Sequence, residues 1–242
     1  MDVALLVLVV TVAVVAGVGA LVFAGSATER RRARALAGWA EREGWRYDRE
    51  RPELVDRFSG DPFAEGRSDA RATHVLCAEL RGHRVLAFEY RYSASHHDGR
   101  ETRTTLHTHT VVVLPARPGT PVLELREESL GHVVLSPLGV HDLRLGESAF
   151  DSRFYVATSD DRFAHAVLDE EVRGWLAGAG AGAVPFRFDG GHLLCWNNRE
   201  LDAERVREAA QTMVCLLERV PAAAWEDGPG APDARSVPDG RG

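Results

Sequence analysis

An uncharged apolar run from Val3 to Ala24 constrains this chain more than any other feature of its sequence. Thr11 is the one polar side chain within it. A helix rises about 1.5 Å per residue, so this run would span about 33 Å, enough for the hydrocarbon core of a bilayer. Lipid offers no partners to backbone groups, which favours a helix there. The sequence therefore predicts a transmembrane anchor over residues 1–27.

Charges on the two sides of this run predict its orientation. Asp2 precedes the run, whereas four arginines follow it closely: Arg30, Arg31, Arg32 and Arg34. A cleaved signal peptide, with Gly25-Ser26-Ala27 as the cleavage site, would need the opposite order of charges. The positive-inside rule predicts a single-pass protein of the cell membrane with its N-terminus outside and its domain in the cytoplasm. The four arginines are then candidate membrane-interface residues that contact anionic lipid.

Composition excludes several function classes. All 29 basic residues are arginine, so neither a Schiff-base lysine nor a P-loop lysine is available. The net charge of -7 argues against a nucleic-acid partner, which would require a surplus of positive charge. Cys77, Cys195 and Cys215 form no CxxC pair and lie within apolar runs, which favours free, buried thiols.

The remainder of the chain divides into three parts. Residues 28–44 are rich in Ala and Arg and end at Gly44, which predicts a juxtamembrane Arg-rich helix. Residues 45–220 carry strand and helix patterns and are expected to form a single α+β domain. Residues 221–242 are rich in Pro, Gly, Ala and Asp, which predicts a disordered tail.

A hairpin is the clearest local prediction within the domain. The runs THVLCAEL and HRVLAFEY are rich in β-formers and are separated by two residues, Arg81 and Gly82. A two-residue turn fixes the register. Four cross-strand pairs are therefore expected: Leu80 with His83, Glu79 with Arg84, Cys77 with Leu86, and Val75 with Phe88.

The other elements complete the predicted fold class. The runs 103–114 and 121–126 are expected to continue the hairpin as an antiparallel meander, and FRF and HLLCW to form a second hairpin. Apolar residues at helical spacing between Asp202 and Val220 predict a long C-terminal helix. The fold class is thus α+β: an antiparallel β-sheet domain with a long C-terminal helix, preceded by one N-terminal transmembrane helix. A pleckstrin-homology-like barrel is the alternative architecture.

Histidines are the candidate metal ligands. His107 and His109 would share one face of a strand, near His96 and His97 in the preceding loop. A turn at Asp98-Gly99 would place His107 opposite Tyr90 and His109 opposite Phe88. His97 would then lie about 23 Å from His107, too far to share a metal. Partly buried sheet residues are the expectation for His107 and His109, with a metal site as the alternative.

The order of these elements resembles that of actinobacterial, membrane-anchored proteins of unknown function. Segments similar to RRRARALAGWAEREGWRY, LRGHRVLAFEYRY and FDSRFYVATSDDRFAHAVLDEEVRGWL carry this resemblance. It implies an anchored domain and provides no catalytic residues.

The function expected from the sequence is that of a non-enzymatic, membrane-anchored interaction or scaffolding domain. The expected partners are the lipid bilayer and another membrane or cytoplasmic protein, and no cofactor is expected. Two alternatives stay open. One is a metal-dependent hydrolase that uses His107 and His109, and the other is a lipid-headgroup-binding module.

Overall fold

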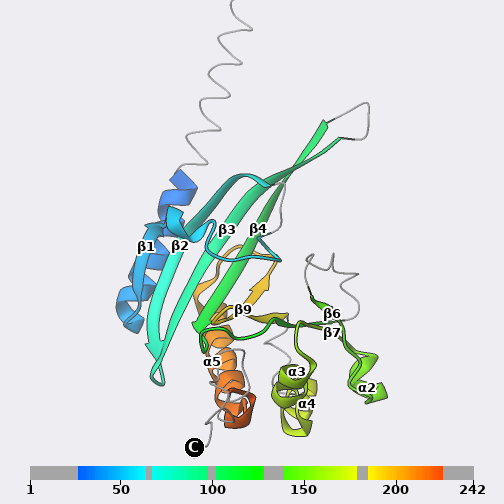
Figure 1. Ribbon diagram of the computed structural model, residues 1–242. Coiled ribbons are helices and arrows are strands. Elements are labelled where there is room, and N and C mark those ends of the chain that lie inside the picture. Colours follow the sequence, from blue (N-terminus) through cyan, green and yellow to red (C-terminus); the bar gives the residue numbers. More distant parts are fainter. Residues whose placement is uncertain (1–26, 64–66, 98–101, 128–138, 179–184, 226–242) are drawn as a thin grey trace, which may run out of the picture.

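A single nine-stranded antiparallel sheet forms the body of the protein (Figure 1). The computed structural model describes residues 27–63, 67–97, 102–127, 139–178 and 185–225. Within them the strand order is β1-β2-β3-β4-β9-β8-β5-β7-β6. The strands are β1 (Arg46–Glu50), β2 (Arg67–Leu80), β3 (His83–His97), β4 (Thr102–Pro115), β5 (Leu123–Glu127), β6 (His141–Asp142), β7 (Phe154–Thr158), β8 (Phe186–Asp189) and β9 (His192–Asn197).

Two longer helices and three shorter ones accompany the sheet in the described residues, and aspartate side chains cap three of them. Residues 27–43 are helical. They are followed by α2 (Ser148–Asp151), α3 (Asp161–Val167), α4 (Glu170–Ala177) and α5 (Ala203–Arg219), with single 3-10 turns at Pro52–Leu54 and Ala222–Trp225. Carboxylates accept backbone N–H groups at the starts of α3, α4 and α5, as N-caps do: Asp160, Asp169 and Asp202.

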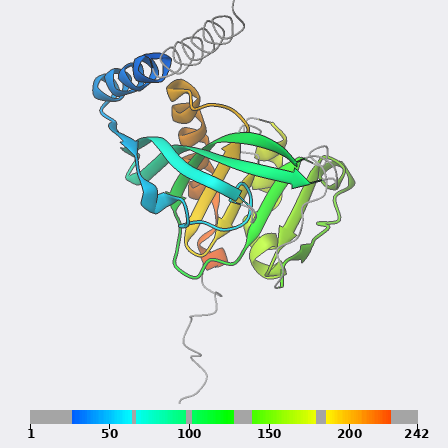
Figure 2. The ribbon, with the colours of Figure 1, turned by 90° about the horizontal axis from the view of Figure 1, so that it is seen from above.

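Both faces of the sheet are covered, but by different parts of the chain. The helix over 27–43 and α5 pack on one face, where Leu36, Trp39 and Met213 join the larger apolar cluster. The segment between β1 and β2 covers the other face with Leu54 and Phe58, and it contacts the middle strands β2, β3, β4 and β9. Figure 2 shows the helix over 27–43 beside the edge of the sheet that β1 forms. This layering places two distinct surfaces on one sheet.

The register predicted for the first hairpin is confirmed close to its turn. Leu80 pairs with His83, Glu79 with Arg84 and Cys77 with Leu86. The predicted pairing of Val75 with Phe88 is absent from this register, because a shift occurs between Thr73 and Leu76. His74 adopts a positive φ of 49° there, which is the geometry of a β-bulge.

The continuous meander predicted after this hairpin is wrong. The run 121–126 forms β5, but β9 and β8 lie between it and β4. The FRF and HLLCW segments do form a hairpin, in which Phe186 pairs with Cys195. That hairpin inserts into the middle of the sheet and pairs with β4 on one side and β5 on the other. Strand order across such a sequence distance is decided by tertiary pairing, which local patterns do not report.

The predicted register of β3 and β4 is wrong by two residues. Tyr92, not Tyr90, pairs with His107, and Tyr90, not Phe88, pairs with His109. The pairing of His97 with Thr102 leaves four residues, 98–101, for the connection instead of the two assumed from Asp98-Gly99. The two strands continue beyond their neighbours as a two-stranded ribbon, which projects from the sheet in Figure 1.

The predicted fold class requires correction. A nine-stranded antiparallel sheet dominates the structure, accompanied by several short helices, and α5 occupies the residues whose spacing predicts a C-terminal helix. The helix predicted over Val3 to Ala24 lies outside the described residues. Among the residues that are described, no helix is both long enough and apolar enough to cross a membrane. The helix over 27–43 and α5 are amphipathic, because each turns a charged side to solvent.

The predicted boundary of the tail also changes. The turn Ala222–Trp225 packs on the domain, where Trp225 lies 5.8 Å from Phe163 and 6.1 Å from Phe188 between ring centroids. Apolar burial explains why the ordered chain continues past Pro221 despite its tail-like composition. The rest of the predicted tail, 226–242, lies outside the described residues.

Candidate functional site

His107 and His109 lie on one face of β4, as the sequence predicts, but they form a stack of rings with Tyr92. The Tyr92 and His107 centroids are 4.9 Å apart, and those of His107 and His109 are 6.4 Å apart with an interplanar angle of 4°. Burial lowers the pKa of His109, which favours its neutral form. In the described parts of the chain, no three His, Cys, Asp or Glu side chains gather closely enough to hold a metal ion.

The four arginines predicted to contact a membrane do not act as one group. Arg30, Arg31 and Arg34 are exposed. Arg32 instead turns toward the sheet and donates from both Nη atoms to the carboxylate of Glu89, at 3.2 and 2.5 Å. Arg32 thus engages an acidic partner inside the protein, and contact of the four arginines with a membrane stays a prediction.

Glu89 is the centre of a buried polar network. Its carboxylate also accepts from Leu201 N at 2.7 Å and lies 2.6 Å from an Nη of Arg91. Burial raises the pKa of Glu89, but the hydrogen bonds from Arg32 and Leu201 and the charge of Arg91 outweigh it, and the pKa lies below its usual value. The network joins the helix over 27–43 to β3 and to the loop before α5.

His74 extends this network across the bulge in β2. Its Nδ1 lies 2.9 Å from the hydroxyl of Tyr47 on β1, and its Nε2 lies 2.7 Å from Glu29 Oε1 on the helix. The imidazole is fully buried. Bulges re-aim side chains next to special sites, and here the bulge points an imidazole at the docked helix.

We expect acid to weaken the fold through His74. Burial lowers its pKa and the charge of Arg32 lowers it further, against the opposing charges of Glu29 and Glu89. The unfolded chain therefore binds a proton below about pH 6.5 that the folded chain does not bind, and the free energy of unfolding falls as the pH drops. This residue should contribute a loss of about 1 kcal/mol between pH 7.5 and pH 5.5, measured by urea titration. Identical pH slopes in wild type and His74→Gln would contradict this assignment.

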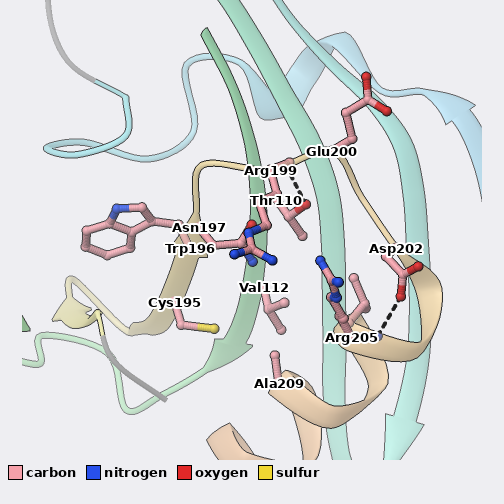
Figure 3. A pocket seen from close by; sticks show the side chains of 11 residues that line it. Thr110, Val112, Cys195, Trp196, Asn197, Arg199, Glu200, Asp202, Arg205 and Ala209 are labelled. Atoms are coloured by element: carbon pink, nitrogen blue, oxygen red, sulfur yellow. Dashed lines mark hydrogen bonds between the residues drawn. The ribbon is translucent and has the colours of Figure 1, made fainter. Parts of the chain in front are cut away.

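A small pocket lies between the start of α5 and strands β4 and β9 (Figure 3). Arg199 and Arg205 line it, together with the thiol of Cys195. Its volume of about 70 Å³ is far below that of pockets for organic ligands. Burial raises the pKa of Cys195 to about 12, so the thiol is protonated and unsuited to nucleophilic attack. This pocket has room for little more than water or a small ion.

A larger groove lies on the opposite face of the sheet, near the turn between β2 and β3. Its volume is about 450 Å³, within the range of sites for small molecules. Strands β1 to β4, the start of β9 and the segment between β1 and β2 all contribute to its lining. We call this groove, together with the side chains that line it, the arginine groove.

Charge distinguishes the arginine groove. Four arginines line it: Arg46, Arg51, Arg57 and Arg84. Glu79 is the acidic side chain in the same lining, and Glu53 lies outside the lining and pairs with Arg51 Nε at 2.8 Å. The lining thus carries a surplus of positive charge in a protein whose net charge is -7. Such a site attracts anions.

The floor of the arginine groove is apolar. Phe58, Leu86 and Val113 line it, and all three belong to the apolar cluster on this face or pack against it. His192 contacts Phe58 edge-on with centroids 5.3 Å apart. Burial lowers the pKa of His192 and the charge of Arg57 lowers it further, so its ring favours the neutral state. The arginine groove therefore combines arginine side chains with an apolar floor.

Sequence reasoning did not identify this groove. Its arginines are scattered between residues 46 and 84 among many others, and the arginine cluster that the sequence does present lies elsewhere. The hairpin register does carry a partial signal, since it places Arg84 and Leu86 on one face of β3. The covering segment that brings Arg51 and Arg57 to that face has no pattern of its own.

Comparison with known proteins identifies a similar fold. No family model matches the chain, and no curated protein sequence matches it. Among solved structures, the crystal structure of the mycobacterial trehalose monomycolate transport factor A, TtfA, is similar with a TM-score of 0.57. The match covers 78% of this chain and 96% of that chain at 19% sequence identity. At this level of identity the likeness establishes the fold alone.

Proposed function

We propose that this chain is a non-enzymatic binding protein that holds an anionic amphiphile in the arginine groove. The observation that carries the proposal is the combination of four arginines with an apolar floor in one groove of about 450 Å³. Guanidinium groups pair well with carboxylate and phosphate, whereas an alkyl chain gains by covering apolar surface. A single-chain lipid with either headgroup combines both features.

The fold likeness to TtfA supports a role in lipid transport. That protein is described as a transport factor for trehalose monomycolate. By analogy, we propose that this chain binds its amphiphile during transfer and leaves it chemically unchanged. The groove supplies cations and apolar side chains, which suit holding a ligand.

Direct binding tests this function. The full chain, stripped of co-purifying lipid, is titrated with a fluorescent long-chain fatty acid and, separately, with a long-chain alkyl phosphate. We expect both to bind, and an alkyltrimethylammonium of equal length to bind weakly. Inorganic phosphate alone should also bind weakly, because it cannot use Phe58, Leu86 and Val113. Equal binding of anionic and cationic chains would contradict the proposal.

Substitution locates the site. We expect Arg51→Gln with Arg84→Gln to raise the Kd for the fatty acid about tenfold, equivalent to about 1.4 kcal/mol. This is modest for two charged contacts because Arg84 is exposed and Arg51 is partly exposed. The matched control is Arg34→Gln with Arg42→Gln, two exposed arginines of the helix over 27–43. An unchanged Kd in the groove variant, or equal losses in both variants, would place the site elsewhere.

The location, the family resemblance and the partners expected from the sequence stay predictions. A cytoplasmic location of the domain stays a prediction, which a reporter fused at Gly242 tests. The resemblance to actinobacterial proteins of unknown function also stays a prediction, and a mycobacterial protein of similar fold is compatible with it. The lipid bilayer and another membrane or cytoplasmic protein as partners also stay predictions.

A further inference from the structure

The outer part of β4 has a neighbouring strand on one side only. β3 pairs with β4 continuously from Thr102 to Val113. On the other side, β9 pairs only from Thr110 to Pro115. Among the described residues, the segment 102–109 therefore has no strand along its second edge. We define this segment as the free edge.

The free edge lacks the devices by which proteins usually block strand pairing. Its sequence, TRTTLHTH, contains neither proline nor glycine, and Arg103 is its one formal charge at neutral pH. No bulge interrupts its register with β3. Threonine favours strands, and Leu106, 66% exposed, is the large apolar side chain most open to solvent in the described structure. A regular and unprotected edge of this kind is suited to accept another strand.

The tip of the ribbon makes an additional partner favourable. β2 pairs with β3 only as far as Ala94, so residues 95–97 and 102–104 pair with each other alone. Ser95 Oγ and Thr104 Oγ1 contact across the two strands at 3.0 Å. An isolated two-stranded ribbon is at best marginally stable in water, so further strands that add apolar contacts would stabilise it. Figure 1 shows this ribbon projecting from the sheet, where a partner can reach it.

We infer that the free edge pairs with the free edge of a second copy of this chain, antiparallel about a two-fold axis that passes between the two copies of Leu106. The length of the edge supports this register. It pairs 103–109 of one copy with 103–109 of the other and stops where β9 begins at Thr110. A two-fold axis makes the interface self-complementary, and two ribbons become one four-stranded sheet.

The side chains also suit this arrangement. In this register Leu106 faces Leu106 of the partner, Thr105 faces His107, Thr104 faces Thr108, and Arg103 faces His109. Arg103 therefore does not face its own copy, which would be unfavourable for like charges directly opposite each other. The exposed surface of Leu106 becomes covered in both copies.

Oligomeric state and amide exchange test the inference together. We expect the full chain to be a dimer in analytical ultracentrifugation, in a detergent whose density the solvent matches. We also expect amides within 102–109 to exchange more slowly as the protein concentration rises. Leu106→Lys should raise the dimer dissociation constant at least tenfold, since it adds an edge charge of the kind that blocks pairing. The matched control Thr212→Lys, on α5, should leave the dissociation constant unchanged.

Three outcomes would overturn the inference. One is a monomer at every concentration reached, which would also result if a strand of a different protein occupies the edge. The second is a dimer that Leu106→Lys leaves intact, and the third is a dimer without slower exchange in 102–109. Leu106 is exposed, so its substitution should leave the fold unchanged, and an unchanged midpoint of urea unfolding verifies this. The inference does not depend on the amphiphile site.

Discussion

Glu89→Ala should lower the free energy of unfolding by about 3–5 kcal/mol, the range found when one partner of a buried ion pair is removed. The carboxylate is fully buried and contacts Arg32, Arg91 and Leu201 N. Its loss removes the buried anion that Arg32 and Arg91 share and leaves them beside the exposed carboxylate of Glu200, at 4.0 and 3.9 Å. Urea unfolding followed by tryptophan fluorescence measures the change, with Trp39 and Trp45 as reporters beside the docked helix.

Glu79→Ala provides the matched control for Glu89→Ala. Glu79 is an exposed glutamate on the neighbouring strand β2, and its loss should change the free energy of unfolding by less than about 0.5 kcal/mol. Arg32→Ala completes a double-mutant cycle with Glu89→Ala. Additive effects in this cycle, or a loss below about 1 kcal/mol for Glu89→Ala, would mean that the network does not hold the helix over 27–43 on the sheet.

Local patterns predict the parts of this fold in which few residues decide the outcome. The two-residue connection Arg81-Gly82 determines the hairpin register as far as the bulge at His74. Apolar spacing likewise identifies α5. Each of these signals lies within a few residues along the chain.

The features that the sequence does not reveal arise from pairing across long sequence separations. Insertion of the β8–β9 hairpin between β4 and β5 could not be predicted from either strand alone. The arginine groove forms because the segment between β1 and β2 folds back over β2, β3 and β4. Arg32 belongs to an arginine cluster whose position after an apolar run predicts contact with a membrane. Its hydrogen bond to Glu89 forms because the tertiary fold brings β3 beside the helix over 27–43.

A second buried charge network holds that folded-back segment in place. Arg187 on β8 is 3% exposed and donates to the backbone carbonyls of Ser59 and Asp61. Its guanidinium lies 3.6 Å from Glu124 and over the ring of Trp196, 5.7 Å from the centroid. Burial lowers the pKa of Arg187, against the charge of Glu124, but its ordinary value is so high that the group keeps its charge.

Glycine at position 60 is required for this contact. Gly60 adopts a φ of 66°, and a Cβ there would collide with the guanidinium of Arg187. The loop 59–63 therefore approaches the sheet closely enough for its carbonyls to accept from Arg187. Since Phe58 and Arg57 immediately precede this loop, the same contact positions one wall of the arginine groove.

We therefore expect Arg187→Met to destabilise the protein by about 3–5 kcal/mol and to weaken amphiphile binding as well. Methionine keeps most of the side-chain volume but leaves two buried backbone carbonyls without their donor, and it leaves Arg126 as the guanidinium paired with Glu124. Urea unfolding measures the first effect, and the fatty acid titration, run under conditions where the variant is folded, measures the second. Arg42→Met, at an exposed position, is the matched control and should change neither. If Arg187→Met lowers stability yet binds the fatty acid as tightly as wild type, the loop 59–63 does not position the groove.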